Sequence, residues 1–397
     1  MLQNFVSLLS GFQVALAPEN IGACLLGAVL GLVVGAMPGI GSLAGCALLL
    51  PLTYKFNPTT AIIMLGALYY SNMYGGSFSA ILLNIPGDSP AITTALDGYP
   101  MALAGKAAEA LGWVTVSAVA GGIFSCFVLA AAAGPLAHLS NKYAGPLEIC
   151  ALIAMGLACI TTLSEGNLIK GLFSGLFGVL LSTVGMDPIS SELRFTFGFM
   201  SVASGIDMLP FIIGLFPLSE VFHRIYEIYT LPDYVIIQCH KIRFPSLREW
   251  FARKWVTLRS AVIGTFIGIL PGTGASPAAF ISYSMAREAS SHPEDFGKGS
   301  VEGVIAPEAS HNAVTGGAMV PTLALGIPGD AETTLILATL TIHQITPGVR
   351  LMLDNPVMVH SIFFLLLIAY IMLTVAAIIM VRSFGRLIRL PNAVLLA

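Results

Sequence analysis

Long apolar stretches, interrupted by short motifs rich in glycine and proline, dominate the chain. Two of them exceed the roughly 20 residues that a helix needs to cross a bilayer: residues 110–135 contain no charged side chain, and residues 355–381 contain only His360 as an ionisable group. Residues 1–16 mix apolar and polar positions in a way that suits a short interfacial helix. The pattern predicts an all-α polytopic membrane protein.

Two other apolar stretches have a Pro-Gly pair near the centre. Residues 21–54 contain Pro38-Gly39-Ile40-Gly41, and residues 260–287 contain Pro271-Gly272-Thr273-Gly274. Proline removes a backbone donor and glycine relaxes the steric limits, so each stretch is expected to form two half-helices that meet at the motif. The second half-helix would present unpaired N–H groups that suit a carboxylate. Hydroxyls of Ser42, Thr273 and Ser276 would either cap these helices or contact a ligand.

The motifs form part of an internal repeat. Gly31-x-x-x-Gly35-x-x-Pro38-Gly39-x-Gly41 recurs 233 residues later as Gly264-x-x-x-Gly268-x-x-Pro271-Gly272-x-Gly274. Gly75-Gly76 followed by Asn84-Ile85-Pro86-Gly87-Asp88 recurs as Gly316-Gly317 followed by Gly326-Ile327-Pro328-Gly329-Asp330. A single Gly-x-x-x-Gly reflects close helix packing alone, but two motifs in the same order indicate duplication.

The Ile-Pro-Gly-Asp segments are predicted to be tips of re-entrant hairpins. Each delivers the chain to an acidic residue followed by hydroxyls, Thr93 and Thr94 in the first copy and Thr333 and Thr334 in the second. Asp88 and Asp330 have two interpretations, helix caps or sites for a coupling ion or proton.

Further polar residues lie in the apolar segments just before the two Gly-Gly pairs. Glu308 is a candidate coupling site because carboxylates inside membranes are costly. His311 would be either a proton shuttle or a hydrogen-bonded structural histidine. Asn72 and Asn312 would either bind a carboxylate or sodium, or hold helices together.

The distribution of charged residues predicts how the two halves are oriented in the membrane. Of the residues, 56% are hydrophobic and 10% are charged, against about 25% charged in soluble domains, and a net charge of −3 gives no support to a nucleic-acid partner. Basic residues cluster within 224–259, which predicts a cytoplasmic connector, whereas none precedes Lys55. The expected organisation is a first inverted repeat with additional helices (1–223), the connector (224–259) and a second inverted repeat, incomplete at its C-terminal end (260–397).

Taken together, the motifs resemble the large membrane subunit of the tripartite tricarboxylate transporter family, of the TctA type. The resemblance rests on the segments 38–41, 74–76, 84–88, 96–101, 270–274, 296–299, 306–309 and 345–348. It implies a bacterial inner-membrane protein that imports citrate or related di- and tricarboxylates with an Na⁺ or H⁺ gradient, beside a small membrane subunit and a periplasmic solute-binding protein. The family pattern has a glycine and a small residue where this chain has Asp330-Ala331-Glu332.

This interpretation needs no catalytic residue, metal or cofactor. A passive anion channel is the first alternative; an intramembrane aspartyl protease using Asp88 and Asp330 is the second, although its Tyr-Asp and Gly-x-Gly-Asp signatures are absent from the sequence. The coupling-ion candidates are Asp88, Asp330, Asn72, Asn312 and Glu308. The positions expected to contact substrate are Pro38, Gly39, Gly41, Ser42, Asn84, Pro86, Gly87, Thr93, Pro271, Gly272, Thr273, Gly274, Pro328, Gly329 and Thr333.

Overall fold

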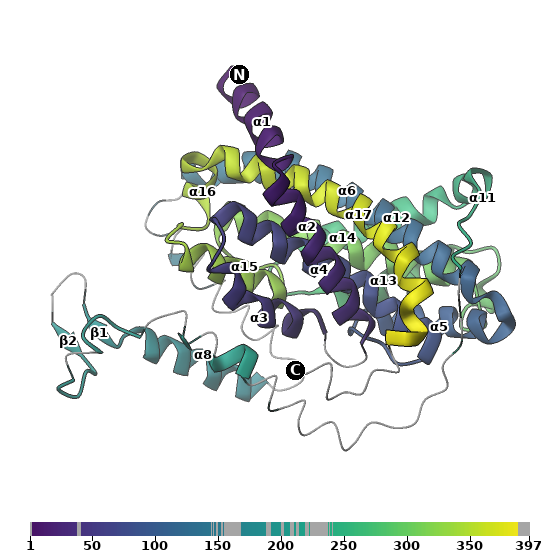
Figure 1. Cartoon of the computed structure of the whole chain (residues 1–397), viewed down its shortest axis with the longest axis horizontal. Helices are drawn as coiled ribbons and strands as arrows, with labels where there is room; N and C mark the ends of the chain where they lie inside the picture. The colour runs from purple at the N-terminus through teal and green to yellow at the C-terminus, as the bar shows by residue number, and fades with distance from the viewer. Residues whose placement is uncertain are drawn as a thin grey trace.

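The fold was examined in a computed structural model of the whole chain (Figure 1). It describes residues 2–37, 41–143, 168–187, 192–199, 202–206, 214–218 and 241–387, with the single or paired positions 145, 147, 150–151, 154, 210–211, 222, 237 and 239. Pro38, Gly39 and residues 224–236, 238 and 240 of the predicted connector therefore lie outside the described residues.

Helices account for nearly all of the regular structure, as the apolar pattern predicts. The first half contains α1 (Leu2–Ala15), α2 (Pro18–Ala36), α3 (Gly41–Thr53), α4 (Pro58–Leu83), α5 (Ala91–Met101), a π-helical turn (Ala102–Lys106) and α6 (Ala107–Tyr143). The middle contains α8 (Leu168–Ser182), the antiparallel pair β1 (Gly185–Met186) and β2 (Leu193–Arg194), and a π-helical turn (Gly214–Leu218). The rest contains α11 (Leu247–Ala252), α12 (Lys254–Ile269), α13 (Ala275–Ala289), a 3-10 turn (Pro293–Asp295), α14 (Val301–Leu325), α15 (Ala331–Ile342), α16 (Val349–Asp354) and α17 (Pro356–Leu387).

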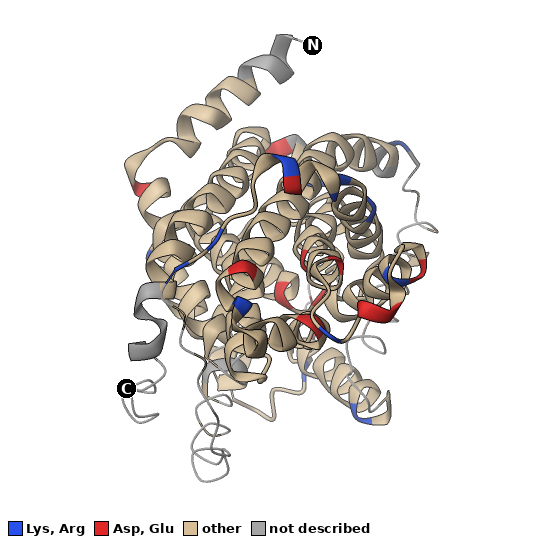
Figure 2. Cartoon of the chain, turned by 90° about the vertical axis from the view of Figure 1, so that its right-hand side faces the viewer, with Lys and Arg blue, Asp and Glu red and all other residues tan. Residues whose placement is uncertain are grey.

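Among the described residues, three helical regions are long and apolar enough to cross a bilayer, namely Pro18–Ala36, Ala91–Leu139 and Pro356–Val381. The last two contain the charge-poor stretches picked out from the sequence. In Figure 2, Lys, Arg, Asp and Glu occupy only scattered positions on the helical body. The all-α membrane fold is confirmed.

α4 and α14 form the centre of the bundle. All residues of α4 from Thr60 to Leu83 are buried, and so are those of α14 from Gly303 to Ala324. A helix that is buried all round must be covered on every side by other helices. The repeated Gly-Gly pairs and the polar residues around them therefore lie in the interior, at the middle of the molecule.

The repeated glycines bring corresponding helices together in each half. A methyl group at Gly31 of α2 would overlap the carbonyl oxygen of Leu68 on α4, and one at Gly264 of α12 would overlap that of Ser310 on α14. Backbones this close require glycine, because any side chain would fill the gap. The Gly-x-x-x-Gly motifs thus hold α2 against α4 and α12 against α14.

The half-helices on either side of each Pro-Gly motif fold back as hairpins. The Asn57 amide, just before α4, donates to Glu19 in the first turn of α2 at 3.2 Å, and the Thr60 hydroxyl lies 2.6 Å from Asn20 Oδ1. The start of α2 and the end of α3 therefore share one end of the bundle. In the second half, Arg253 at the start of α12 shares a pocket with Ser290, which follows α13. The predicted half-helices are present on either side of each motif, and in both halves they turn back instead of continuing in one direction.

The two hairpins lie towards opposite ends of the bundle. At the end where α4 finishes, Gly98 of α5 packs against Ile81 of α4, and Met101 packs against Gly299, just before the start of α14. In Figure 1, α3 and α15 lie towards the left-hand end, and α5, α12 and α13 towards the right-hand end. The inverted relationship of the halves stays a prediction, and this placement of helix ends agrees with it.

The packing of α2 against α4 gives a direct test. We expect Gly31→Ala to lower the free energy of unfolding by about 1–3 kcal/mol, because the added methyl group overlaps the α4 backbone. Gly22→Ala is the matched control on the same helix, since no atom lies within 4 Å of a methyl group there. Thermal unfolding of both purified variants in detergent measures the difference; equal melting temperatures would contradict this packing.

Candidate functional site

The hydroxyl of Ser42 joins loops of both halves. Ser42 lies in the first turn of α3 and is buried; its Oγ is 3.0 Å from Asp88 Oδ2 and makes a still closer contact with Glu332 Oε1. Asp88 belongs to the first Ile-Pro-Gly loop and Glu332 to the first turn of α15. A hydroxyl has one proton, so it can donate to only one of these carboxyl groups at a time. For both contacts to be hydrogen bonds, the other carboxyl group must be protonated and donate to Ser42.

Asp330 lies at the other side of this group of residues. Its carboxylate accepts a hydrogen bond from the Thr333 backbone N–H at 2.9 Å, and the Thr333 hydroxyl accepts one from the Asp330 N–H at 3.0 Å. The Tyr69 hydroxyl of α4 donates to its second oxygen. The helix-cap interpretation is confirmed for Asp330, which also binds the first half of the chain.

Asp88 does not cap a helix. α5 begins at Ala91 after Pro90, with no capping side chain. Asp88 instead accepts a hydrogen bond from the Ser89 N–H at 2.9 Å, in addition to its contact with Ser42. The helix-cap interpretation is therefore wrong for Asp88, which leaves its carboxyl group facing the Ser42 hydroxyl.

In each half, the Ile-Pro-Gly loop touches the hairpin tip of the same half. The Gly272 N–H donates to the Gly329 carbonyl oxygen at 2.8 Å. In the first half, a methyl group at Gly87 would overlap the carbonyl oxygen of Gly35, which lies in the last turn of α2. In the second half the two interruptions therefore share a hydrogen bond, and in the first half the Ile-Pro-Gly loop packs closely against the last turn of α2, as suits buried backbone inside a membrane.

The remaining predicted substrate contacts have mixed outcomes. Gly41 begins α3 with φ +67°, and Gly274 precedes α13 with φ +71°, so both use the conformational freedom of glycine. The Thr273 hydroxyl lies 2.6 Å from the carbonyl oxygen of Ile267 and 2.8 Å from that of Leu270; it donates to one of them at a time and so closes the end of α12. It does not cap α13.

Asn84 ends α4 in the left-handed conformation and is exposed. Together with Pro86 it lines a surface hollow of about 290 Å³ beside α5. Thr93 is fully buried, and its hydroxyl has no hydrogen-bond partner among the described residues. Pro271 and Pro328 are each partly buried beside the glycines that join their loops.

A second buried polar cluster surrounds Glu308 of α14. Its Oε1 accepts hydrogen bonds from Ser77 of α4 and, at 2.6 Å, from Thr94 of α5. Its Oε2 lies 3.5 Å from His311 Nε2, which is too long for a good hydrogen bond. Glu308, which the sequence places either in the membrane or at its interface, is fully buried inside the bundle.

The other coupling candidates near Glu308 are also unusual. Neither ring nitrogen of His311 has a hydrogen-bond partner in the part of the chain that the structure describes, which gives no support to the interpretation as a hydrogen-bonded structural histidine. The Asn312 amide nitrogen donates to Glu308 O of its own helix at 3.0 Å, whereas its oxygen has no partner there. Neither amide atom of Asn72 has one either. Within the described residues, no side-chain bond of these asparagines holds two helices together.

Asp97 is an additional buried carboxylate that sequence reasoning missed. It lies on α5, and its Oδ1 accepts hydrogen bonds from the N–H groups of Gly297, Gly299 and Ser300 at 2.7–2.9 Å, while Oδ2 accepts one from Tyr283 of α13 at 2.8 Å. This clamp holds α5 of the first half to the α13–α14 loop of the second. A signal was present in the sequence, since an aspartate interrupts the apolar residues of 91–103.

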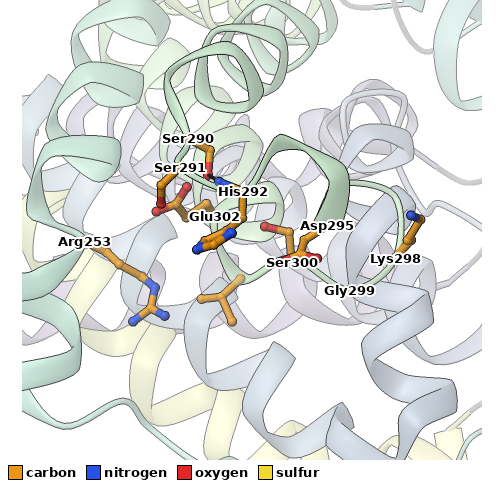
Figure 3. A pocket seen from close by; sticks show the side chains of 10 residues that line it. Arg253, Ser290, Ser291, His292, Asp295, Lys298, Gly299, Ser300 and Glu302 are labelled. Atoms are coloured by element: carbon orange, nitrogen blue, oxygen red, sulfur yellow. Dashed lines mark hydrogen bonds between the residues drawn. The ribbon is translucent and has the colours of Figure 1, made fainter.

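The same loop borders a hollow of about 380 Å³ at the end of the bundle (Figure 3). Arg253 and Lys298 lie at opposite sides of it, with His292 between them. Asp295 and Glu302 also line it, so its charge is mixed. Arg253 lies 5.1 Å from the centroid of the Trp113 ring of α6, which places the hollow beside the start of that helix.

Tyr69, Ser77, Thr94 and Glu332 were also missing from the predicted site. The second Ile-Pro-Gly-Asp copy places Glu332 near Asp330, which was its signal. Nothing in the local sequence distinguishes Tyr69 or Ser77 from other polar residues of α4, because their roles depend on partners more than 200 residues away.

The Asp97 clamp predicts a large stability effect. We expect Asp97→Ala to lower the free energy of unfolding by about 3 kcal/mol or more, since four donors lose a charged acceptor. Asp295→Ala, at an exposed position of the same loop region, is the control. Thermal unfolding in detergent is the measurement, and a similar small effect of both substitutions would rule out the clamp.

Comparisons with known proteins agree with the resemblance seen in the sequence. The family described as "Tripartite tricarboxylate transporter TctA family" matches residues 21–397. A protein of Agrobacterium vitis, "Uncharacterized 52.8 kDa protein in TAR-I ttuC' 3'region", is 36% identical over 396 residues, which cover 99% of this chain and 78% of that protein. A second one, "Uncharacterized protein in TAR-II ttuC' 3'region", is 31% identical over 132 residues, 33% of this chain and 54% of that protein. No solved structure matches the chain.

Proposed function

This chain belongs to the tripartite tricarboxylate transporter TctA family, and from that premise we propose that it imports small di- or tricarboxylates across the bacterial inner membrane as a multi-pass protein. A periplasmic solute-binding protein delivers the substrate, and a small membrane subunit completes the complex. A gradient of Na⁺ or H⁺ drives the uptake.

The observation that carries this proposal is the meeting of both halves at Ser42. The first hairpin supplies Ser42, the first Ile-Pro-Gly loop supplies Asp88, and the second supplies Glu332 through the start of α15. Interrupted helices inside a membrane are tolerated where they line a cavity or are buried in protein. Transporters built from inverted repeats place substrate and ion sites at such interruptions near the midplane.

The charge of the site supports coupling to a cation. Asp88, Asp330 and Glu332 would repel a carboxylate substrate, because two like charges about 4 Å apart cost roughly 4 kcal/mol at an effective dielectric constant of 20. A co-transported Na⁺ or proton would remove that repulsion. The carboxylate itself would contact backbone N–H groups at the starts of α3 and α13, which carry the positive ends of helix dipoles.

A passive channel remains the alternative that transport measurements can separate. Purified complex in proteoliposomes is expected to accumulate radiolabelled citrate or a dicarboxylate above its external concentration when a cation gradient is imposed. Sodium and pH gradients are varied independently. Dissipating both gradients is expected to release the accumulated substrate; uptake that never exceeds equilibration under any gradient would instead indicate a channel.

Ser42 gives a second test of the site. We expect Ser42→Ala to reduce gradient-driven uptake about 10- to 100-fold, because hydrogen bonds to charged groups contribute roughly 1.5–3 kcal/mol. Ser361→Ala is the matched control: its buried hydroxyl bonds only to Met358 O, one turn earlier in α17, among the contacts of the described residues. Equal uptake by both variants, at equal amounts of folded protein, would remove Ser42 from the mechanism.

A further inference from the structure

The Glu308 cluster is distinct from the Ser42 site in composition. Glu308, His311, Ser77 and Thr94 are all fully buried, and they come from three helices, α4, α5 and α14. Two hydroxyls donate to the same carboxylate oxygen, Oε1. The second oxygen has no hydrogen-bond partner among the described residues and lies nearest to the imidazole of His311.

The ring nitrogens of His311 are, like Glu308 Oε2, without a hydrogen-bond partner within the described ranges. No neighbouring group there therefore fixes which nitrogen carries the proton. A carboxylate oxygen and an imidazole nitrogen 3.5 Å apart form a pair that holds one proton on either member.

The corresponding position of the other half is also polar and unpartnered. The shift that relates Gly75-Gly76 to Gly316-Gly317 places Tyr70 and Ser71 opposite His311 and Asn312. The Ser71 hydroxyl and the Asn312 amide oxygen both lack partners among the described residues. Tyr70 stacks on Tyr370 of α17 with ring centroids 5.2 Å apart, and the Tyr370 hydroxyl donates to Asn312 O at 3.2 Å. Ser71 and Asn312 are therefore uncommitted polar groups at equivalent positions of α4 and α14.

The ionisable groups around the pair carry no compensating positive charge. Tyr74 of α4 bonds with Thr115 of α6 at 2.6 Å, and Tyr370 of α17 bonds with Thr315 at 2.9 Å. Asp97 of α5, one turn beyond Thr94, is engaged by Tyr283 and the α13–α14 loop. Within the described residues, His311 is the basic side chain at ion-pair distance from Glu308.

We propose that Glu308 and His311 together bind a coupling proton, so that this chain is driven by protons and has a proton site apart from, and in addition to, the cation site proposed at the carboxyl groups around Ser42. The inference rests on the proposed carboxylate transport. A proton from one side of the membrane binds to Glu308 Oε2 or His311 Nε2 without breaking the bonds that Ser77 and Thr94 make to Oε1. It leaves to the other side after the halves have moved, and no other chemical bond changes.

The experiment uses the purified complex in proteoliposomes that contain a pH-sensitive dye. Two activities are measured for each variant: accumulation of labelled carboxylate with proton entry under an inward proton gradient, and exchange of labelled for unlabelled carboxylate without any gradient. Each pH unit supports about a tenfold concentration ratio per co-transported proton. The wild type is expected to accumulate substrate and take up protons. Glu308→Gln is expected to exchange substrate but to accumulate none and move no protons.

Glu302→Gln is the matched control, because Glu302 lies in the first turn of the same helix but at the partly exposed end of the bundle. It is expected to behave like the wild type. If Glu308→Gln does not fold, His311→Gln replaces it, with the same expected loss of proton entry.

The outcomes separate this inference from the proposed function. Proton-driven accumulation by both Glu308→Gln and His311→Gln at the wild-type level would overturn the proton site. Accumulation by the wild type that follows sodium alone, without proton entry, would also overturn it but would leave the transport function standing. Absence of exchange in the wild type with every carboxylate tested would instead contradict the proposed function.

Discussion

The interior of a bilayer offers no hydrogen-bond partner, so each interruption of a membrane helix must be covered by other parts of the protein. This constraint explains why the interruptions of the chain lie against one another. The second hairpin tip bonds to its own Ile-Pro-Gly loop through Gly272 and Gly329, and the first is packed against Gly87. Ser42 and Tyr69 then connect the first half to Glu332 and Asp330 of the second.

Close helix packing acts within each half, whereas buried carboxylates connect the two halves. Glycines of α2 and α12 set the distance to α4 and α14, where any side chain would collide with backbone. Carboxylates join the halves in three places: Asp97 near the end of the bundle, Glu308 through Ser77 and Thr94, and Asp330 with Glu332 near the hairpin tips. In the proposed transport cycle, such contacts between the halves would form in one state and separate in another.

The sequence was sufficient to predict the helical membrane fold and the gathering of Ser42, Asp88 and Asp330 in one region. It could not predict that the half-helices turn back, because an apolar stretch of about 34 residues with a central break fits a crossing or a hairpin equally well. Asp88 and Asp330 occupy equivalent motif positions, but only Asp330 caps a helix. Asp330 stands directly before α15, whereas the residue directly before α5 is Pro90, two positions after Asp88. Glu308 was found from its charge alone. Its partners Ser77 and Thr94 were not, because tertiary contacts decide them.

The most direct measurement of the central claim is disulfide formation between Ser42→Cys and Glu332→Cys, in a background without the six native cysteines. Mild oxidation of membranes is predicted to link the two positions, to block uptake, and to do so reversibly when reductant is added. A second pair, Tyr69→Cys with Asp330→Cys, is tested under the same conditions. If neither pair cross-links, the result contradicts a site built from both halves.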